Sequence, residues 1–585
     1  MKRVFGDNLF LGDFMNKSNV KREQSFLYAT LVLGVSTVLV KVLGAIFRIP
    51  ISNLIGASGM GYFSTAYDIF MPIYSLAMAG LPVAVARIIA EQVAQKKYKD
   101  ARKTFKITNY AFWVTGIVGL ALMFIMAYVV TAVASNPRAL PAAIVIAPSI
   151  LFCCIMSAYR GYYEGLRNMY PTAISSLIEA VCKLVLGYGF AFIIMKNMQG
   201  EPLQVASYAA AGAMLGITLG SVFGAIYLAL EHKIKGDGFS SLEVENSPEP
   251  ETGKKLLKTL VVFAIPVAIG SLVNNVASLI DVAMVQRQIK NAVETAPEFF
   301  NSAFGKYLFD DNGVAIATSN VPGFLSNFLY GCYKGYAYTI FNLVPSITCV
   351  VGVSALPILT AAWTKGEKTA IKANIESMLK TITLIAFPAG IGILALAPQI
   401  VSLLYSDESA VVAVNLLRVL GVAACFAGMT TPLTNMLQAI GKPSVPVKNI
   451  AVGAVIKIVV NFVLVGIPEI NILGAPIGTL CCYLYIAIAD IYCLVKYSKI
   501  RPNFFAAILK PFLAALCCGL SAFGVNALLS AVISHQKLVT LASVLVAALV
   551  YVVAIAMLKC ISAEDVETLP KGEKLVKVLG KFHII

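Results

Sequence analysis

Charged side chains occur inside stretches of the sequence that are otherwise apolar. Lys41 and Arg48 are seven residues apart, which places them on one face of a helix, and no acid lies three or four positions from either of them. A guanidinium binds phosphate through two parallel hydrogen bonds, and an ammonium binds it as a point charge. We therefore expect Arg48 and Lys41 to face a cavity and to bind an anionic group.

Two later apolar stretches each carry a lysine on a polar face at helical spacing. Lys183 follows Glu179 by four residues, and Lys457 lies between Asn449 and Asn461. At this spacing Glu179 and Lys183 can neutralise each other as an ion pair. Alternatively, Lys183 and Lys457 line the path of an anionic ligand. The sequence leaves both interpretations open.

Acids and amides complete the expected polar surface. Asp68 and Asp281 are predicted either to bind a coupling cation or to pair with basic residues, and Asn274 and Asn342 are predicted to contact the substrate. A charged side chain costs about 2.5–3.5 kcal/mol at the centre of a bilayer, so these groups must face protein or water. The excess of basic residues makes the predicted cavity positive, which suits an anion.

Motifs that would indicate an enzyme or a metal site are absent from the sequence. It has no phosphate-binding loop, no nucleophile elbow, no zinc-protease motif and no C-x-x-C pair, and its three histidines have no metal-ligand neighbour at helical spacing. No pair of carboxylates in a polar loop provides the metal site expected of a membrane glycosyltransferase or polymerase. We therefore expect no metal, no cofactor and no catalytic residue.

The composition indicates a membrane protein. The 585 residues are 58% hydrophobic and 13% charged, with a mean hydropathy of +0.81, whereas a soluble domain is about half apolar and a quarter charged. The net charge of +16 comes from short basic clusters between apolar stretches, where lysine and arginine set orientation and contact anionic headgroups. Nucleic acid is therefore not an expected partner.

About fourteen stretches are long enough to cross a hydrocarbon core roughly 30 Å thick. Lysine and arginine are concentrated in every second connection between them, which by the positive-inside rule places both termini in the cytoplasm. The first stretch is predicted to be a retained helix and not a cleaved signal peptide. The stretches lie near residues 27–49, 62–90, 107–134, 140–160, 171–195, 203–230, 258–286, 335–362, 377–405, 409–438, 446–467, 470–496, 503–531 and 536–559.

The second half of the sequence repeats the first at an offset of about 274 residues: Gly61-Tyr62 matches Gly335-Tyr336, and Lys183 matches Lys457. Each unit has six predicted spans, so the repeats are parallel, and such repeats in transporters enclose a substrate site between two lobes. We predict a cytoplasmic N-terminal segment (1–26), a first lobe (27–230) and a cytoplasmic linker (231–257). We then expect a second lobe (258–496) with an external loop (287–334), two helices outside the repeat (503–559) and a cytoplasmic tail (562–585).

Four segments carry a family resemblance. They are Lys41-Val-Leu-Gly-Ala-Ile-Phe-Arg48-Ile-Pro50, Gly56-Ala-Ser-Gly-Met-Gly-Tyr62, Ala79-Gly-Leu-Pro-Val-Ala-Val-Ala-Arg87 and Tyr159-Arg-Gly-Tyr-Tyr-Glu-Gly165 followed by Pro171. In these segments the chain resembles the stage V sporulation protein B and MurJ-like lipid II flippases. That family lies within the multidrug/oligosaccharidyl-lipid/polysaccharide exporter superfamily, and the resemblance covers nearly the whole chain.

The resemblance implies that an undecaprenyl-pyrophosphate-linked sugar is flipped from the inner to the outer leaflet through a cationic cavity between two lobes. In the MurJ branch the first, second and eighth helices contribute arginines to that cavity. Arg48 matches the first position, but the second helix offers Asp68 and no arginine in mid-span, and the eighth offers Tyr338 and Asn342. This departure favours the sporulation or polysaccharide branch over lipid II itself.

The sequence thus predicts a flippase or exporter of a lipid-linked oligosaccharide in the bacterial plasma membrane. Its expected partners are the polyprenyl-pyrophosphate-linked substrate, membrane lipids and cell-wall synthesis enzymes, and the resemblance implies a groove for the lipid tail against the last two helices. Two alternatives stay open. One is a multidrug exporter of the same superfamily, although a site for cationic drugs should be anionic, and the other is a membrane scaffold for envelope assembly that transports nothing.

Overall fold

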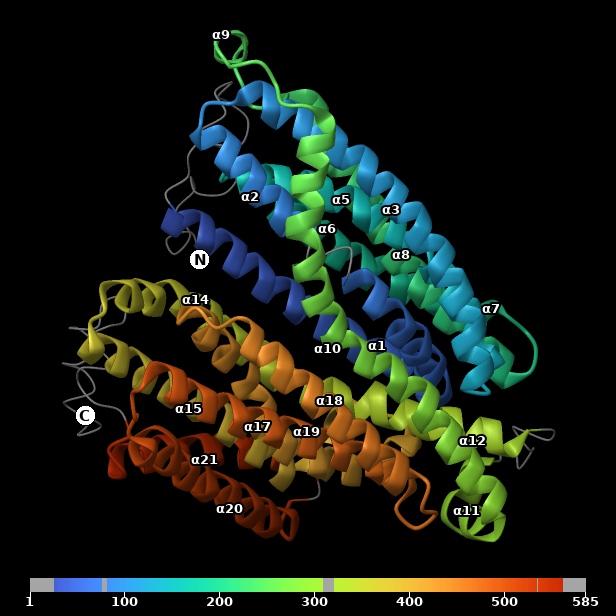
Figure 1. The fold of residues 1–585 in the computed structure, drawn as a ribbon. Helices are drawn as coiled ribbons and strands as arrows, with labels where there is room; N and C mark the ends of the chain where they lie inside the picture. The colour runs from blue at the N-terminus through green and yellow to red at the C-terminus, as the bar shows by residue number, and fades with distance from the viewer. Residues whose placement is uncertain (1–25, 76–80, 309–319, 534, 561–585) are drawn as a thin grey trace, which may run out of the picture.

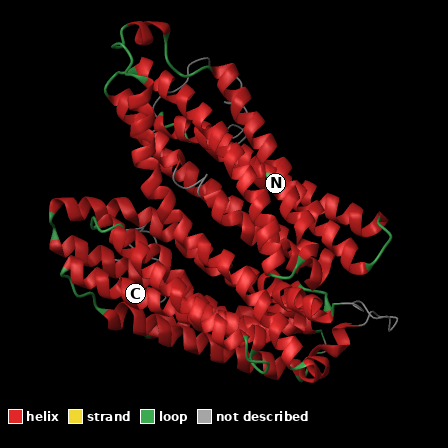
Figure 2. Ribbon diagram, turned by 45° about the vertical axis from the view of Figure 1, so that its right-hand side comes forward, coloured by secondary structure: helices red, strands yellow, loops and turns green. Residues whose placement is uncertain are grey.

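The computed structural model describes residues 26–75, 81–308, 320–533 and 535–560. Within these ranges the chain forms helices joined by short connections and contains no strand (Figure 2). The predicted all-α membrane fold is therefore confirmed. The terminal segments predicted at 1–26 and 562–585 lie outside the described residues, except for Phe26.

The first half of the chain forms a series of long helices with short 3-10 and π-helical inserts, of which η2 is a 3-10 helix and η3 a π-helix. The elements are α1 (Phe26–Ser75), α2 (Leu81–Ala94), α3 (Tyr98–Val133), η2 (Pro137–Ala139), α4 (Leu140–Ile146), α5 (Pro148–Gly165), α6 (Tyr170–Cys182), η3 (Lys183–Gly187), α7 (Tyr188–Asn197), α8 (Pro202–Lys235) and α9 (Ser241–Glu245).

The second half is built in the same way, with η4, η6 and η7 as 3-10 helices and η5 and η8 as π-helices. The elements are α10 (Gly253–Thr295), α11 (Pro297–Phe304), η4 (Gly305–Leu308), α12 (Val321–Gly331), η5 (Cys332–Ala337), α13 (Tyr338–Phe341), α14 (Leu343–Lys365), α15 (Lys368–Ala395), α16 (Ala397–Leu404), η6 (Glu408–Val412), α17 (Ala413–Ala439), α18 (Ser444–Val465), η7 (Asn471–Leu473), α19 (Gly474–Ser498), η8 (Phe505–Leu509), α20 (Lys510–Ser530) and α21 (Gln536–Met557).

The helices form two bundles arranged as a V (Figure 1). The first bundle contains α2 to α8 and the second contains α12 to α21, and α1 and α10 run along the junction between them. The bundles converge at the end where α12 packs against α1, and they diverge toward the end where α1 begins. Both halves also repeat one packing pattern: α6 and α7 pack against α8 and α1, as α18 packs against α19 and α10.

The turn inside α1 depends on Gly56. This residue has φ 65° and ψ −177°, which interrupts the helix and lies in a region that non-glycine residues rarely adopt. Beyond the turn, the second segment of α1 comes very close to α12, because a Cβ at Gly61 would lie 2.3 Å from the Asn327 carbonyl oxygen and one at Gly331 would lie 1.9 Å from that of Ala57. Small residues therefore let the two halves approach at the converged end.

Twelve helices of the described chain are long and apolar enough to cross a membrane. One of them, Leu39–Ser75, includes the turn at Gly56, and α10 is not among the twelve. The chain is therefore a multi-pass membrane protein, whereas the expected number of fourteen spans stays a prediction.

The segment predicted as an external loop at 287–334 contains more helix than expected. α10 continues to Thr295, α11 and η4 follow, and α12 begins at Val321. Asn327 and Lys334 interrupt the apolar character of this segment, yet their exposed fractions are only 1% and 4%. Because these polar groups have partners inside the protein, the helix begins well before the apolar stretch predicted at 335–362.

The predicted linker at 231–257 is attached to the first bundle by charges. Arg102 on α3 forms an ion pair with Asp237, and the Lys99 ammonium lies 3.3 Å from the Glu249 carboxylate. These contacts fix the linker to the start of α3. Since α10 begins directly after the linker, its first turns are anchored to the first bundle.

Candidate functional site

Two cations lie beside one aromatic ring near the junction of the bundles. The Arg48 guanidinium carbon is 5.3 Å from the centre of the Tyr67 ring, and the Lys183 ammonium is 5.5 Å from the same centre and 5.1 Å from the centre of the Phe47 ring. Arg48 Nη1 also donates a long hydrogen bond of 3.5 Å to Thr339 Oγ1 on α13, in the second bundle. Arg48 therefore reaches from α1 across the junction.

Neither of these cations has an acidic partner in the part of the chain that the structure describes. Glu179, the residue four positions before Lys183, instead binds Arg160 on α5 with an Nη2–Oε2 distance of 2.5 Å. Arg160 Nε donates to Ser175 Oγ at 3.0 Å, which completes the contact inside the first bundle. Lys183 itself begins the π-helix η3 and is half-buried. The pairing of Glu179 with Lys183 that the sequence left open is not formed.

The other predicted ligands lie at varied places. Lys41 is half-buried on α1 and has no acid partner within the described ranges. Asn342 is half-buried at the join of α13 and α14. Asn274 falls in α10, but its side chain lies outside the described residues. The structure thus brings Arg48 and Lys183 together and, among the predicted ligands whose side chains it describes, places no other in contact with them.

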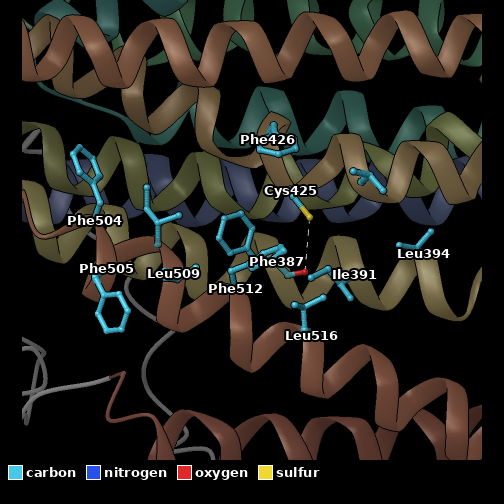
Figure 3. Close-up of a pocket in the computed structure, with 12 residues that line it drawn as sticks. Phe387, Ile391, Leu394, Cys425, Phe426, Phe504, Phe505, Leu509, Phe512 and Leu516 are labelled. Atoms are coloured by element: carbon cyan, nitrogen blue, oxygen red, sulfur yellow. Dashed lines mark hydrogen bonds between the residues drawn. The ribbon is translucent and has the colours of Figure 1, made fainter.

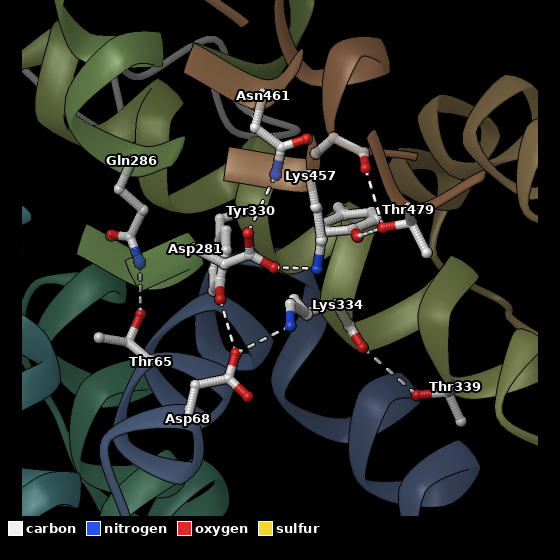
Figure 4. A network of polar contacts seen from close by, with 12 residues as sticks. Thr65, Asp68, Asp281, Gln286, Tyr330, Lys334, Thr339, Lys457, Asn461 and Thr479 are labelled. Atoms are coloured by element: carbon white, nitrogen blue, oxygen red, sulfur yellow. Dashed lines mark hydrogen bonds and ion pairs between the residues drawn. The ribbon is translucent and has the colours of Figure 1, made fainter. Parts of the chain in front are cut away.

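Lys457, the repeat equivalent of Lys183, is neutralised. Its ammonium forms an ion pair with Asp281 on α10, and Asn461 Nδ2 donates to the other oxygen of the same carboxylate at 3.0 Å (Figure 4). The Lys457 and Asp281 side chains are 11% and 1% exposed. This buried pair connects α18 to α10 inside the second half of the chain.

Asp68 is neutralised by a residue that the sequence analysis did not single out. The Lys334 ammonium on η5 lies 3.1 Å from Asp68 Oδ2, and the Tyr330 hydroxyl donates to the same oxygen at 2.6 Å (Figure 4). Lys334 stood at the edge of a predicted loop. Lys334 lies four residues from both Tyr330 and Tyr338, which places the three on one helix face. This spacing is the sequence signal that could have identified it as a buried polar residue. The pair joins the first half of the chain to the second.

Uncharged side chains form a second contact at the converged end. Asn136 Nδ2 donates to Gln286 Oε1 at 2.9 Å and to Asn327 Oδ1 at 2.7 Å, and Gln286 Nε2 donates to Thr65 Oγ1 at 2.7 Å. All four side chains are buried. They come from four segments, so this cluster holds both halves of the chain together.

The Gly56 turn is fixed to the second bundle at the same end. Asn53 Nδ2 donates to the Leu404 carbonyl at 2.9 Å, and Asn53 Oδ1 accepts from the Ser406 backbone N–H at 3.0 Å. Asp407 Oδ2 accepts from the Tyr336 hydroxyl at 2.5 Å and from the Ala57 N–H at 3.3 Å. Hydrogen bonds and ion pairs therefore hold the converged end together, in addition to close helix packing.

An apolar pocket of about 680 Å³ lies in the second bundle, between α15, α17 and the segment from Phe504 into α20 (Figure 3). Such a volume is within the range of ligand pockets. Among its walls the Cys425 thiol donates weakly to the Phe387 carbonyl at 3.9 Å. The lining residues are Phe387, Ile391, Leu394, Val422, Cys425, Phe426, Phe504, Phe505, Ile508, Leu509, Phe512 and Leu516.

Comparison with known families and proteins gives consistent matches. Residues 26–364 match the model of the family described as polysaccharide biosynthesis protein, and residues 313–551 match that of lipid II flippase MurJ. Two Bacillus subtilis (strain 168) proteins are similar to this chain. Lipid II flippase MurJ is 23% identical over 78% of this chain and 81% of its own length. Stage V sporulation protein B is 22% identical over 95% of this chain and 99% of its own length.

Solved structures share the fold. An inward closed conformation of lipid II flippase MurJ superposes with a TM-score of 0.58 at 13% identity and covers 90% of this chain and 98% of its own. An inward-facing multidrug resistance MATE family transporter of the MOP superfamily superposes with a TM-score of 0.59 at 15% identity. This match covers 80% of this chain and 99% of that transporter. Together these similarities support a flippase or exporter of a lipid-linked precursor and leave the substrate open.

Proposed function

Because the chain belongs to the polysaccharide biosynthesis protein family, we propose that it moves a lipid-linked saccharide with a pyrophosphate group from the inner to the outer leaflet. The observation that carries this proposal is the pair of cations, Arg48 and Lys183, that meet at Tyr67 without an acid partner among the described residues. An anion bound there would contact both bundles, since Arg48 already reaches Thr339.

The chemistry of a pyrophosphate fits these two side chains. Arg48 supplies two parallel N–H donors for two phosphate oxygens, and Lys183 supplies a point charge. Both side chains are half-buried, so their charges are screened less than on a protein surface. Lys41 and Asn342, both half-buried, are proposed to line the path of the head group. Lys457 is proposed to act through its pair with Asp281 and not as a direct ligand.

The apolar pocket between α15, α17 and α20 supplies a place for the lipid chain. It carries aromatic and aliphatic side chains, so an isoprenoid would bury apolar surface there at about 25 cal/mol per Å². Part of its wall comes from η8 and α20, which lie outside the repeated unit. The proposal thus places the head group near the junction and the lipid tail in the second bundle.

The multidrug exporter is the second candidate, because a MATE transporter shares the fold. A cationic drug needs an unneutralised acid. Asp68 and Asp281 are both paired with lysines, so a cationic drug or a coupling cation would have to displace an ammonium from either acid. The charges therefore favour an anionic substrate. A scaffold without transport leaves Arg48 and Lys183, which have no acid partner among the described residues, without a role.

The proposed direction of transport requires cytoplasmic termini and an external α11. A cysteine introduced at Ser302, which is exposed on α11, should react with a membrane-impermeant maleimide in intact cells. A cysteine at Glu249, whose side chain is 91% exposed in the linker, should react only after permeabilisation. The reverse pattern would invert the topology and the proposed direction.

The function is tested by flipping in proteoliposomes. Purified protein is reconstituted with a fluorescent polyprenyl-pyrophosphate oligosaccharide, and its appearance in the opposite leaflet is measured by quenching from outside. We expect transport of the pyrophosphate-linked lipid and none of a lipophilic cationic dye. Transport of the dye alone would support the multidrug exporter. Transport of neither by correctly inserted protein would contradict both transport functions.

A further inference from the structure

The two cations of the site are held by aromatic rings. Lys183 lies over Phe47 and Tyr67, and Arg48 lies over Tyr67, all within the range of about 6 Å in which a cation is attracted to a ring face. Phe47 is fully buried, and Tyr67 is half-buried. Tyr67 is therefore shared by both cations and links two helical segments that are distant in sequence.

Aromatic rings and carboxylates differ in whether they leave the charge of a bound cation available to a ligand. A ring attracts a cation through its quadrupole but carries no net charge, so it does not cancel the charge of the cation. A carboxylate cancels that charge, as Asp281 does for Lys457 at the equivalent position of the second repeat. The same position of the repeat thus carries an available cation in the first half and a neutralised one in the second.

The rings are themselves fixed by the fold. Phe63 stacks on Tyr67 with centroids 6.1 Å apart and an interplanar angle of 11°, and it also contacts Phe47 at 6.1 Å. Phe47 comes before the Gly56 turn, and Phe63 and Tyr67 come after it, so the turn in α1 assembles the group. On the facing π-helix, a Cβ at Gly187 would lie 3.1 Å from the Phe47 ring, which shows how closely η3 approaches it.

We propose that Tyr67 and Phe47 are positioning residues, which hold Arg48 and Lys183 beside one shared ring without cancelling the charges that a pyrophosphate would bind. This inference rests on the proposed function and adds a specific role for the rings. It assigns Tyr67 the larger effect, since that ring contacts both cations and Phe47 contacts only one of them.

The test measures binding of a short-chain polyprenyl pyrophosphate to full-length protein in lipid nanodiscs, by calorimetry, with inorganic pyrophosphate as a second probe. Tyr67→Leu removes the ring and should weaken binding about tenfold, in line with the strength of a partly desolvated cation–ring contact. Tyr67→Phe keeps the ring and should stay within about threefold of the original protein. Tyr67→Glu adds a carboxylate beside both cations and should abolish binding.

Phe70→Leu is the matched control. Phe70 is a buried ring on the same helix that contacts Tyr67 at 6.2 Å but has no cation over it within the described residues. If Phe70→Leu weakens binding as much as Tyr67→Leu, the rings only support packing and the inference is wrong. Binding by Tyr67→Leu or Tyr67→Glu at the original strength also overturns it. If the unmodified protein binds neither probe, the proposed function fails first and the inference fails with it.

Discussion

Lys183 and Lys457 occupy equivalent positions of the two repeats, yet their surroundings are opposite. Lys183 is half-buried beside two rings and has no acid partner within the described chain, whereas Lys457 is buried and paired with Asp281. A buried ion pair is costly to break because its partner remains charged and desolvated. Equivalent positions of the two repeats therefore differ: the proposed binding role falls on Lys183, and Lys457 is held in a structural ion pair.

The largest effect is expected from removing Arg48, which has no acid partner among the described residues. Arg48→Ala should abolish flipping while the protein still inserts and accumulates, because no carboxylate of the described chain loses its partner. Arg48→Lys should recover part of the activity, since it keeps the charge but loses the planar fork. Transport in proteoliposomes and the amount of membrane-inserted protein are measured together. Full activity in Arg48→Ala, or disappearance of the protein, would contradict a binding role.

The next effect separates the two lysines by stability. Asp281→Asn leaves Lys457 buried without a carboxylate and should destabilise the protein by about 3–5 kcal/mol, with a matching fall in its thermal unfolding temperature in detergent. Replacing both residues, Asp281→Asn with Lys457→Met, should recover most of that loss. Lys183→Met should reduce transport and leave the unfolding temperature nearly unchanged. Equal destabilisation by Lys183→Met and Asp281→Asn would remove the distinction between the repeats.

A smaller effect is expected at the contact between the halves. Asp68→Asn removes the charge that binds Lys334. We expect the free energy of opening the converged end to fall by about 1–2 kcal/mol, which raises the population of the open form about 5–30-fold. The readout is maleimide labelling of Thr65→Cys, a position with no exposure in the closed junction. Arg138→Gln is the control, because its pair with Glu201 at 2.7 Å lies inside the first bundle. Labelling that responds to both variants equally would reflect general loosening.

The smallest effect is expected in the linker. Lys99→Ala breaks an exposed pair with Glu249 and should change stability by less than about 0.5 kcal/mol. Nearby, a hydrogen bond from Lys255 lowers the pKa of Glu251. The contribution of Glu251 is therefore present at neutral pH and is lost as the pH falls through this lowered pKa. Thermal unfolding at neutral and acidic pH measures both effects. A shift as large as that of Asp281→Asn would make the linker a major stabilising element.

Sequence patterns predicted the helices well, because hydropathy reports directly which segments can face lipid. They predicted polar groups inside the membrane but not the partners of those groups. Lys457 and Asp281 are 176 residues apart, and only the packing of α10 on α18 brings them together. For the same reason, Glu179 pairs with Arg160 and not with Lys183, although Lys183 is nearer in the sequence.

Two parts of the site gave weaker signals. Lys334 directly precedes the apolar stretch predicted at 335–362, so it falls in the loop predicted at 287–334. Tyr67 is one aromatic residue among many in an apolar helix, and nothing in its neighbourhood of the sequence indicates two cations. The role of a ring as a cation partner depends on the turn at Gly56 and on the approach of η3, which spacing along one helix does not encode.

The contact between Asp68 and Tyr330 has a consequence for how the protein is made. These residues are 262 positions apart. At a synthesis rate of about 5–20 residues per second, the ribosome needs roughly 13–50 s to produce the partner after Asp68 has emerged. During that interval neither Lys334 nor Tyr330 is present to bind the carboxyl group of Asp68. The nascent first half therefore has to keep an acid whose partners are not yet translated in contact with water or with the insertion machinery.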